Sequence, residues 1–186
     1  MCECTANACS ALTDPAHGNF SALSGVTGDS ITLTCAAGYT PSGATAFACT
    51  ASGWSPAPVT ACTPNPCAAL SNPAHGTFSA LAGVTGDTVS FSCGAGYSVV
   101  GATSFSCTAA GWSPSAMPAC SPNACVTLTN PPHGNFSSLS GVTGSTVTLS
   151  CAAGYSVFGA GSIQCTATGW SPTPLPTCSA NPCPAL

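Results

Sequence analysis

The sequence predicts a tandem array of small all-β modules, each rich in disulfides and joined to the next by a short linker. Three observations lead to this fold class. The chain holds 15 cysteines in 186 residues, a density typical of exported disulfide scaffolds. The cysteines recur with a period of 58 residues from Cys9 onward, which indicates a structural repeat. The run before the second cysteine of each copy alternates apolar and polar residues, as a half-buried strand does, and no segment has convincing helical periodicity.

The repeat defines three complete modules. Within each copy the cysteines are spaced by 26, 14 and 13 residues, and five residues lead to the next copy. The modules therefore cover residues 9–62, 67–120 and 125–178. Residues 1–8 read as the tail of a preceding module and a linker, and residues 179–186 as a linker and the start of a following one. Cys2, Cys4 and Cys183 are left over, which indicates inter-chain bonds or a truncated array. We expect a longer exported precursor, because the start lacks the features of a signal peptide.

Two strands are predicted in each module. The first covers 30–35, 88–93 and 146–151 in successive copies, and the second covers 46–49, 104–107 and 162–165. Glycine-containing turns separate them. A unit of this size buries little apolar surface, whereas each bridge contributes roughly 3–4 kcal/mol in the chain-entropy model. We therefore expect the disulfides to be the main scaffold, with one Trp and one Tyr packed beside them in each module.

The composition excludes several classes of partner. The chain has no Lys or Arg and a formal charge of −4, so it cannot neutralise the phosphates of nucleic acid. Heparin-like polyanions and acidic lipid surfaces are disfavoured for the same reason. No apolar run approaches the roughly 20 residues of a membrane span. Zinc is the competing interpretation of dense cysteine, but C-x-x-C pairs are absent. We expect no metal and no cofactor.

The motifs between the cysteines resemble those of the sushi domain, also called the complement control protein module or short consensus repeat. The likeness extends over nearly the whole chain, because all three copies fit the pattern equally well. In the first copy the matching residues are Cys9, Pro-Ala-His-Gly at 15–18, Cys35, Gly38-Tyr39, Gly43, Cys49, Gly53-Trp54, Pro58 and Cys62.

The resemblance implies a cysteine pairing that the residues alone leave open, since four cysteines allow three pairings. It implies first-to-third and second-to-fourth bonds and modules elongated from pole to pole. Short proline-bearing linkers at 63–66 and 121–124 would then give a rod. The implied bridges are Cys9–Cys49, Cys35–Cys62, Cys67–Cys107, Cys93–Cys120, Cys125–Cys165 and Cys151–Cys178.

The titratable residues do not form a recognisable catalytic or metal site. His17, His75 and His133 occupy one equivalent position per module, and copies spread along a rod would keep them apart. We interpret them as turn residues that pack on a neighbour. Asp29 and Asp87 are equivalent, but the third copy has Ser145 there, so no shared carboxylate chemistry is required. No nucleophile arrangement is readable, and we expect no enzyme activity.

Glycans are expected to solvate a surface so poor in charge. Asn19 and Asn135 begin N-glycosylation sequons of the form Asn-Phe-Ser, and the second copy breaks the pattern with Thr77. The alternative is an ordinary turn asparagine. Proline-flanked hydroxyls are candidate O-glycan acceptors, although Thr is also simply a good strand residue. These candidates are Ser55, Thr60, Ser171, Thr173 and Thr177.

One apolar segment recurs after each sequon position. We expect its phenylalanines, Phe20, Phe78 and Phe136, to join the module cores. Its other apolar side chains either fold onto the core or form a stripe that contacts a neighbouring chain. These are Leu23, Leu81, Leu139, Val26, Val84 and Val142.

Two functional hypotheses follow for an extracellular protein, secreted or at the cell surface. The first is a structural protein, the repeat subunit of a glycosylated fibre that self-associates end to end or laterally. Near-interchangeable copies without basic residues favour it over ligand binding. The alternative is an adhesion or complement-regulator-like ectodomain that binds a protein ligand through its sushi modules.

Overall fold

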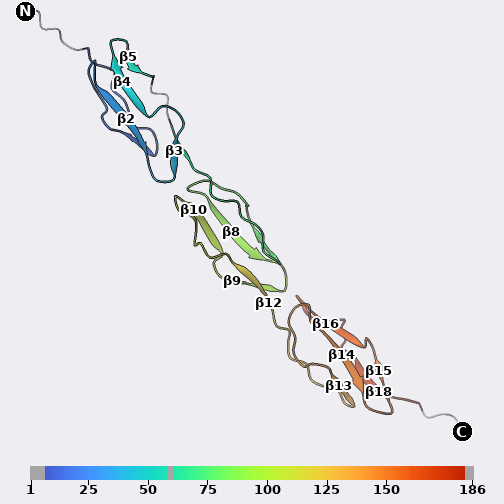
Figure 1. The fold of residues 1–186 in the computed structure, drawn as a ribbon. Coiled ribbons are helices and arrows are strands. Elements are labelled where there is room, and N and C mark those ends of the chain that lie inside the picture. The colour runs from blue at the N-terminus through green and yellow to red at the C-terminus, as the bar shows by residue number, and fades with distance from the viewer. Residues whose placement is uncertain (1–6, 58–60, 183–186) are drawn as a thin grey trace, which may run out of the picture. The chain divides into compact units, whose positions relative to one another are not determined.

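The protein is all-β in the part of the chain that the computed structural model describes, residues 7–57 and 61–182 (Figure 1). Contacts between Cα atoms divide it into two compact units. The first holds residues 1–70, 80–90 and 104–115, and the second holds residues 71–79, 91–103 and 116–186. The boundary between the units runs through the middle copy of the repeat.

Each copy builds one four-stranded and one two-stranded antiparallel sheet. The four-stranded sheets have the orders β1-β2-β4-β5, β7-β8-β10-β11 and β13-β14-β16-β17, and the pairs are β3-β6, β9-β12 and β15-β18. The strands of the first copy are β1 (Gly18–Phe20), β2 (Ser30–Cys35), β3 (Tyr39–Pro41), β4 (Ala46–Thr50), β5 (Gly53–Ser55) and β6 (Cys62–Pro64). Those of the second are β7 (Gly76–Phe78), β8 (Thr88–Cys93), β9 (Tyr97–Val100), β10 (Ser104–Thr108), β11 (Gly111–Ser113) and β12 (Ala119–Pro122). Those of the third are β13 (Gly134–Phe136), β14 (Thr146–Cys151), β15 (Tyr155–Phe158), β16 (Ser162–Thr166), β17 (Gly169–Ser171) and β18 (Thr177–Ala180).

The longest strands lie where the sequence predicts them. β2, β8 and β14 have the predicted bounds, and β4, β10 and β16 extend one residue past the third cysteine. The remaining strands have three or four residues, too few to display a period of two. The Pro-x-x-Gly element, for example, continues directly into β1, where Gly18 pairs with Cys35.

A small core lies against the disulfides of each copy. In the first copy it comprises Ile31, Leu33, Phe47 and Trp54 together with three cysteines. The alternation of β2 makes this possible, because Ile31 and Leu33 are buried while Thr32 and Thr34 are exposed. The corresponding buried residues are Val89, Phe91, Phe105 and Trp112 in the second copy and Val147, Leu149, Ile163 and Trp170 in the third.

The phenylalanines after the sequon positions lie in or against the cores. Phe78 and Phe136 are buried, and Phe20 packs partly buried on the first core. The leucines left open by the sequence are exposed instead, as are Val26 and Val142. Val84 is half-buried. The backbones of the three valines form isolated bridges to Ala8, Pro66 and Ala124.

Six disulfides link the first cysteine of each copy to the third and the second to the fourth, the order that the resemblance implies. They are Cys9–Cys49, Cys35–Cys62, Cys67–Cys107, Cys93–Cys120, Cys125–Cys165 and Cys151–Cys178. Cys2, Cys4 and Cys183 lie outside the described residues.

The glycine of the Pro-x-x-Gly element lies directly against a disulfide. A Cβ on Gly134 would come within 2.5 Å of the Cys178 sulfur and 3.1 Å of Leu149 Cδ1. Gly134→Ala is therefore expected to destabilise the third module by about 1–3 kcal/mol through overpacking. Gly161→Ala is the matched control, since a Cβ there meets nothing within 4 Å. Chemical denaturation of both variants measures the difference, and equal losses would contradict this account of the glycine.

Each linker asparagine is hydrogen-bonded on both sides within one compact unit. In the first unit the Asn65 N–H donates to the Gly38 carbonyl at 2.8 Å, and the Asn65 carbonyl accepts from the Thr85 N–H at 2.9 Å. In the second unit Asn123 makes the same two bonds to Gly96 and Thr143. The linkers are therefore tied to the loops beside them, while the rod shape stays a prediction.

Candidate functional site

The histidine of each copy is part of a repeated aromatic stack. His17 has a φ of 60°, a left-handed conformation that is uncommon outside glycine. Its ring lies parallel to that of Tyr39, with the centroids 4.1 Å apart, and its carbonyl accepts a hydrogen bond from the Ala36 N–H. The pairs His75–Tyr97 and His133–Tyr155 repeat the stack at 4.0 Å. The histidines are thus turn residues that pack on a neighbour, as the sequence predicts.

The aspartates at the start of the long strands stabilise turns. The Asp29 carboxylate accepts a hydrogen bond from the Val26 N–H at 2.8 Å, and Asp87 does the same for Val84. In the third copy the Ser145 hydroxyl accepts from the Val142 N–H at 3.1 Å. A hydroxyl replaces the carboxylate here because only a hydrogen-bond acceptor is needed. Among residues 7–57 and 61–182, no three His, Cys, Asp or Glu side chains come close enough to share a metal ion.

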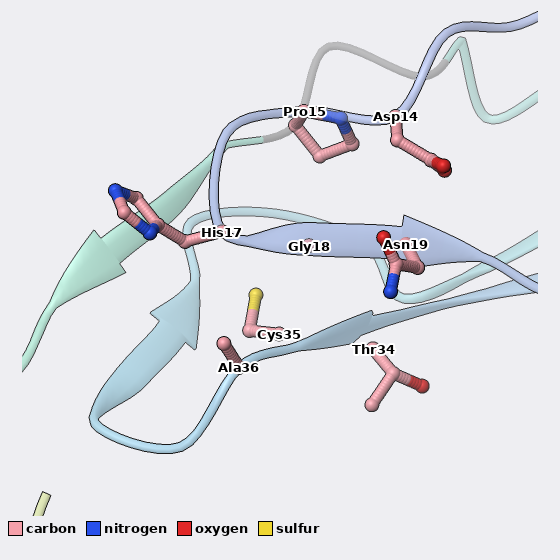
Figure 2. Close-up of a pocket in the computed structure, with 8 residues that line it drawn as sticks. All are labelled: Asp14, Pro15, His17, Gly18, Asn19, Thr34, Cys35 and Ala36. Atoms are coloured by element: carbon pink, nitrogen blue, oxygen red, sulfur yellow. The ribbon is translucent and has the colours of Figure 1, made fainter.

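The first sequon begins on β1 at an exposed asparagine that lines a cavity (Figure 2). Asn19 is exposed in the middle of β1 and pairs with Thr34 of β2. The cavity has a volume of about 340 Å³, within the range of small-ligand sites. Its lining residues are Asp14, Pro15, His17, Gly18, Asn19, Thr34, Cys35 and Ala36.

Asp14 connects this cavity to the sequon strand. One of its carboxylate oxygens accepts a hydrogen bond from the Phe20 N–H at 2.7 Å. The corresponding acceptors in the other copies are amide oxygens, those of Asn72 for Phe78 and Asn130 for Phe136. The position therefore needs an acceptor, and only the first copy supplies a charged one.

The second sequon has a different local environment. Asn135 lies exposed on β13, but its side-chain oxygen accepts a hydrogen bond from the Asn130 side-chain amide at 3.0 Å. In both sequons the serine hydroxyl is engaged, since Ser21 accepts from the Thr32 N–H and Ser137 from the Thr148 N–H, each at 3.0 Å. The two candidate glycosylation sites thus differ in the neighbouring acceptor, which is Asp14 beside Asn19 and Asn130 beside Asn135.

The candidate O-glycan acceptors lie on the surface where the structure describes them. Ser55, Ser171, Thr173 and Thr177 are exposed, whereas Thr60 lies outside the described residues. Their exposure permits modification but does not select among them, so O-glycosylation stays a prediction.

The third copy exposes a large apolar side chain at two positions where the first copy has serine. Val126 is 81% exposed and Phe158 is 71% exposed. The residues at their positions in the first copy are Ser10 and Ser42. Beside Val126 lies a cavity of about 320 Å³ with apolar walls and threonine hydroxyls. Its lining residues are Val126, Thr127, Leu128, Thr129, Thr168, Trp170, Thr173 and Leu175.

No formal charge accompanies these exposed apolar side chains. Residues 125–178 contain no Asp, Glu, Lys or Arg. A neutral surface with exposed apolar side chains is suited to contact with a protein, and not to contact with ions or phosphates.

Comparison with known families decides what the modules are. A model of the sushi repeat, or SCR repeat, matches residues 9–62, 67–120 and 125–178. The chain belongs to the sushi family. The matched segments are the three disulfide-linked copies, so each copy is one sushi module.

Curated relatives with sushi modules align with most or all of the chain. Human E-selectin is 30% identical over 203 residues, covering 100% of this chain and 32% of the relative. Rat E-selectin is 32% identical and covers 84% of this chain and 30% of the relative. Bovine beta-2-glycoprotein 1 is 32% identical and covers 84% of this chain and 47% of the relative. The chain thus spans less than half the length of these relatives, which are extracellular or cell-surface proteins. Its sushi modules are extracellular as well.

Two features of the sushi modules were not predicted from the sequence. The contact between residue 14 or 130 and the sequon strand was not predicted, although aligning the three copies reveals the Asp14, Asn72 and Asn130 series. The exposure of Val126 and Phe158 was not predicted, because near-identity of the copies favours equivalent surfaces. The same alignment contains its signal, Ser42, Val100 and Phe158 at one position.

Proposed function

We propose that the chain is a non-enzymatic segment of an extracellular ectodomain and that its third sushi module binds a protein ligand. The exposed Phe158 is the observation that carries this proposal, because the first module has a serine at the same place in the same fold. Aromatic side chains dominate the energetics of protein interfaces. The alignment with selectins and beta-2-glycoprotein 1 supports an ectodomain. It lends no support to the fibre subunit that the sequence alone favours.

The ligand is expected to present apolar side chains and neutral hydrogen-bonding groups. Val126 and Leu175 beside the cavity offer apolar contact, and the surrounding threonines offer hydroxyls. Burying a large apolar side chain such as Phe158 contributes about 1.5–3 kcal/mol. A ligand that contacts Phe158 is therefore expected to lose ten-fold or more in affinity when this residue is replaced by serine.

The test is a binding screen of the three-module chain against an array of purified extracellular proteins, followed by surface plasmon resonance on each hit. Phe158→Ser and Val126→Ser reproduce the residues of the first module, so we expect them to fold. Val100→Ser, at the position of Phe158 in the second module, is the matched control. We expect ten-fold weaker binding for the third-module variants and unchanged binding for the control. Unchanged binding by all variants would contradict the proposed surface.

Sedimentation velocity of the native chain separates this function from self-association. A ligand-binding ectodomain is expected to sediment as a monomer at micromolar concentration. If the native chain instead forms a polymer at higher concentration, and Phe158→Ser abolishes it, Phe158 would be a contact between chains, as the fibre hypothesis requires.

A further inference from the structure

We propose that the cavity beside Asn19 seats the first N-acetylglucosamine of a glycan attached to that asparagine. The proposal rests on Asn19 being glycosylated in the secretory pathway. Attachment forms a bond between Asn19 Nδ2 and C1 of the sugar and breaks the bond from C1 to the pyrophosphate of the lipid-linked donor. The amide proton is removed during the transfer. After attachment, the residues that line the cavity hold the sugar.

The position of Asn19 places an attached sugar at the cavity. Asn19 is itself one of the lining residues, so its side chain lies at the cavity and is exposed to solvent (Figure 2). Its side chain makes no hydrogen bond with the described residues, which leaves Nδ2 available. The sugar nearest the asparagine is thereby brought to the cavity walls.

The walls offer the groups that a sugar with hydroxyls and an acetamido N–H requires. One Asp14 oxygen accepts from the Phe20 N–H, and the other has no hydrogen-bond donor among the described residues. A carboxylate oxygen accepts hydrogen bonds from hydroxyl or amide donors more strongly than a neutral oxygen does. Thr34, a residue with a side-chain hydroxyl, lines the same cavity, and Pro15 supplies an apolar wall.

The third module provides the internal comparison. There Asn130 replaces Asp14, and its amide donates to the Asn135 side-chain oxygen at 3.0 Å. That contact shows that side chains at the positions of Asp14 and Asn19 are within hydrogen-bonding reach of each other in this fold. A neutral amide already bonded to the sequon asparagine is a weaker acceptor for the sugar. We therefore expect the glycan on Asn19 to be held against the protein and the glycan on Asn135 to be free.

The test uses the chain secreted from mammalian cells and peptide-N-glycosidase F, which cuts the bond between asparagine and the first sugar. Mass spectrometry of glycopeptides follows release at each site from the native and the denatured chain. We expect release from Asn19 to be ten-fold or more slower than from Asn135 in the native chain. After reduction and denaturation the two rates are expected to be equal.

Exchanging Asp and Asn at the acceptor position distinguishes an effect of the cavity from other causes of slow glycan release. Asp14→Asn is expected to bring the Asn19 rate toward that of Asn135, and Asn130→Asp is expected to slow release from Asn135. Both variants should fold, because each residue occurs naturally at the equivalent position. Thr77→Asn creates a sequon in the second module beside Asn72, and we expect the rate of that site to match Asn135. Equal native rates at Asn19 and Asn135, no effect of Asp14→Asn, or an unmodified Asn19 would each overturn the proposal.

Discussion

Replacing Cys67 and Cys107 together by serine is expected to unfold the second sushi module while the other two remain folded. This bridge joins residues 40 apart in sequence, and Cys107 is buried in the module. Loss of a native bridge from a small secreted domain costs about 2–5 kcal/mol. A core of this size supplies only about 3–5 kcal/mol in total. The expected loss is therefore comparable with the whole stability of the module.

Proteolysis can locate the unfolded module. Trypsin has no site, because the chain lacks Lys and Arg, so chymotrypsin is the appropriate enzyme. We expect rapid cleavage after aromatic residues within 67–120 and slow cleavage elsewhere. Replacing Cys9 and Cys49 is the matched variant and should move the cleavage to 9–62. A Cys67 and Cys107 variant as resistant as the native chain at 37 °C would show that the core suffices without the bridge.

Trp54→Ala is expected to destabilise the first module by about 3–5 kcal/mol, the usual cost of removing a buried Trp. Trp54 belongs to the first core, and its ring packs against Gly25, where an added Cβ would lie 2.9 Å from the ring. Its indole N–H also donates to the Ser10 carbonyl at 2.9 Å. The side chain therefore joins the segment after the first cysteine to the sheet.

Two further variants separate packing from the hydrogen bond. Trp54→Phe keeps most of the apolar contact and leaves the Ser10 carbonyl without its donor, at a cost of about 1–3 kcal/mol. Leu23→Ala changes an exposed side chain and should alter the stability by no more than about 0.5 kcal/mol. Denaturant titration of the three variants measures the order. A loss for Trp54→Ala no larger than that for Leu23→Ala would contradict the assigned core.

The sequence predicted the two longest strands of each copy, in which buried and exposed residues alternate. The alternation of Ile31 and Leu33 with threonines determined both the bounds and the buried face of β2. The spacing of the cysteines defined the copies, but their pairing required the family resemblance, because any of three pairings satisfies the spacing. The short strands β1, β3 and β5 are positioned by their partners, which a local pattern cannot reveal.

The residues of the candidate sites could be predicted from the sequence, but the side chains that surround them could not. The motif around Asn19 identifies a sequon, yet the cavity beside it depends on Asp14, which reaches the strand through a contact with the Phe20 N–H. Exposure of Phe158 likewise depends on its place at the end of β15, where it pairs with Thr177 of β18. Near-identity of the copies suggested a passive structural repeat. The differences between the copies at exposed positions are the basis of the binding function proposed above.

Two specific bridges hold each sushi module together and leave its surface available for glycans and ligands. A disulfide map of the secreted chain tests it most directly. Digestion with pepsin at low pH prevents exchange of the bridges, and mass spectrometry then identifies the linked peptides. We expect first-to-third and second-to-fourth bonds in all three modules. Free thiols within the modules, or bonds in another order, would contradict it.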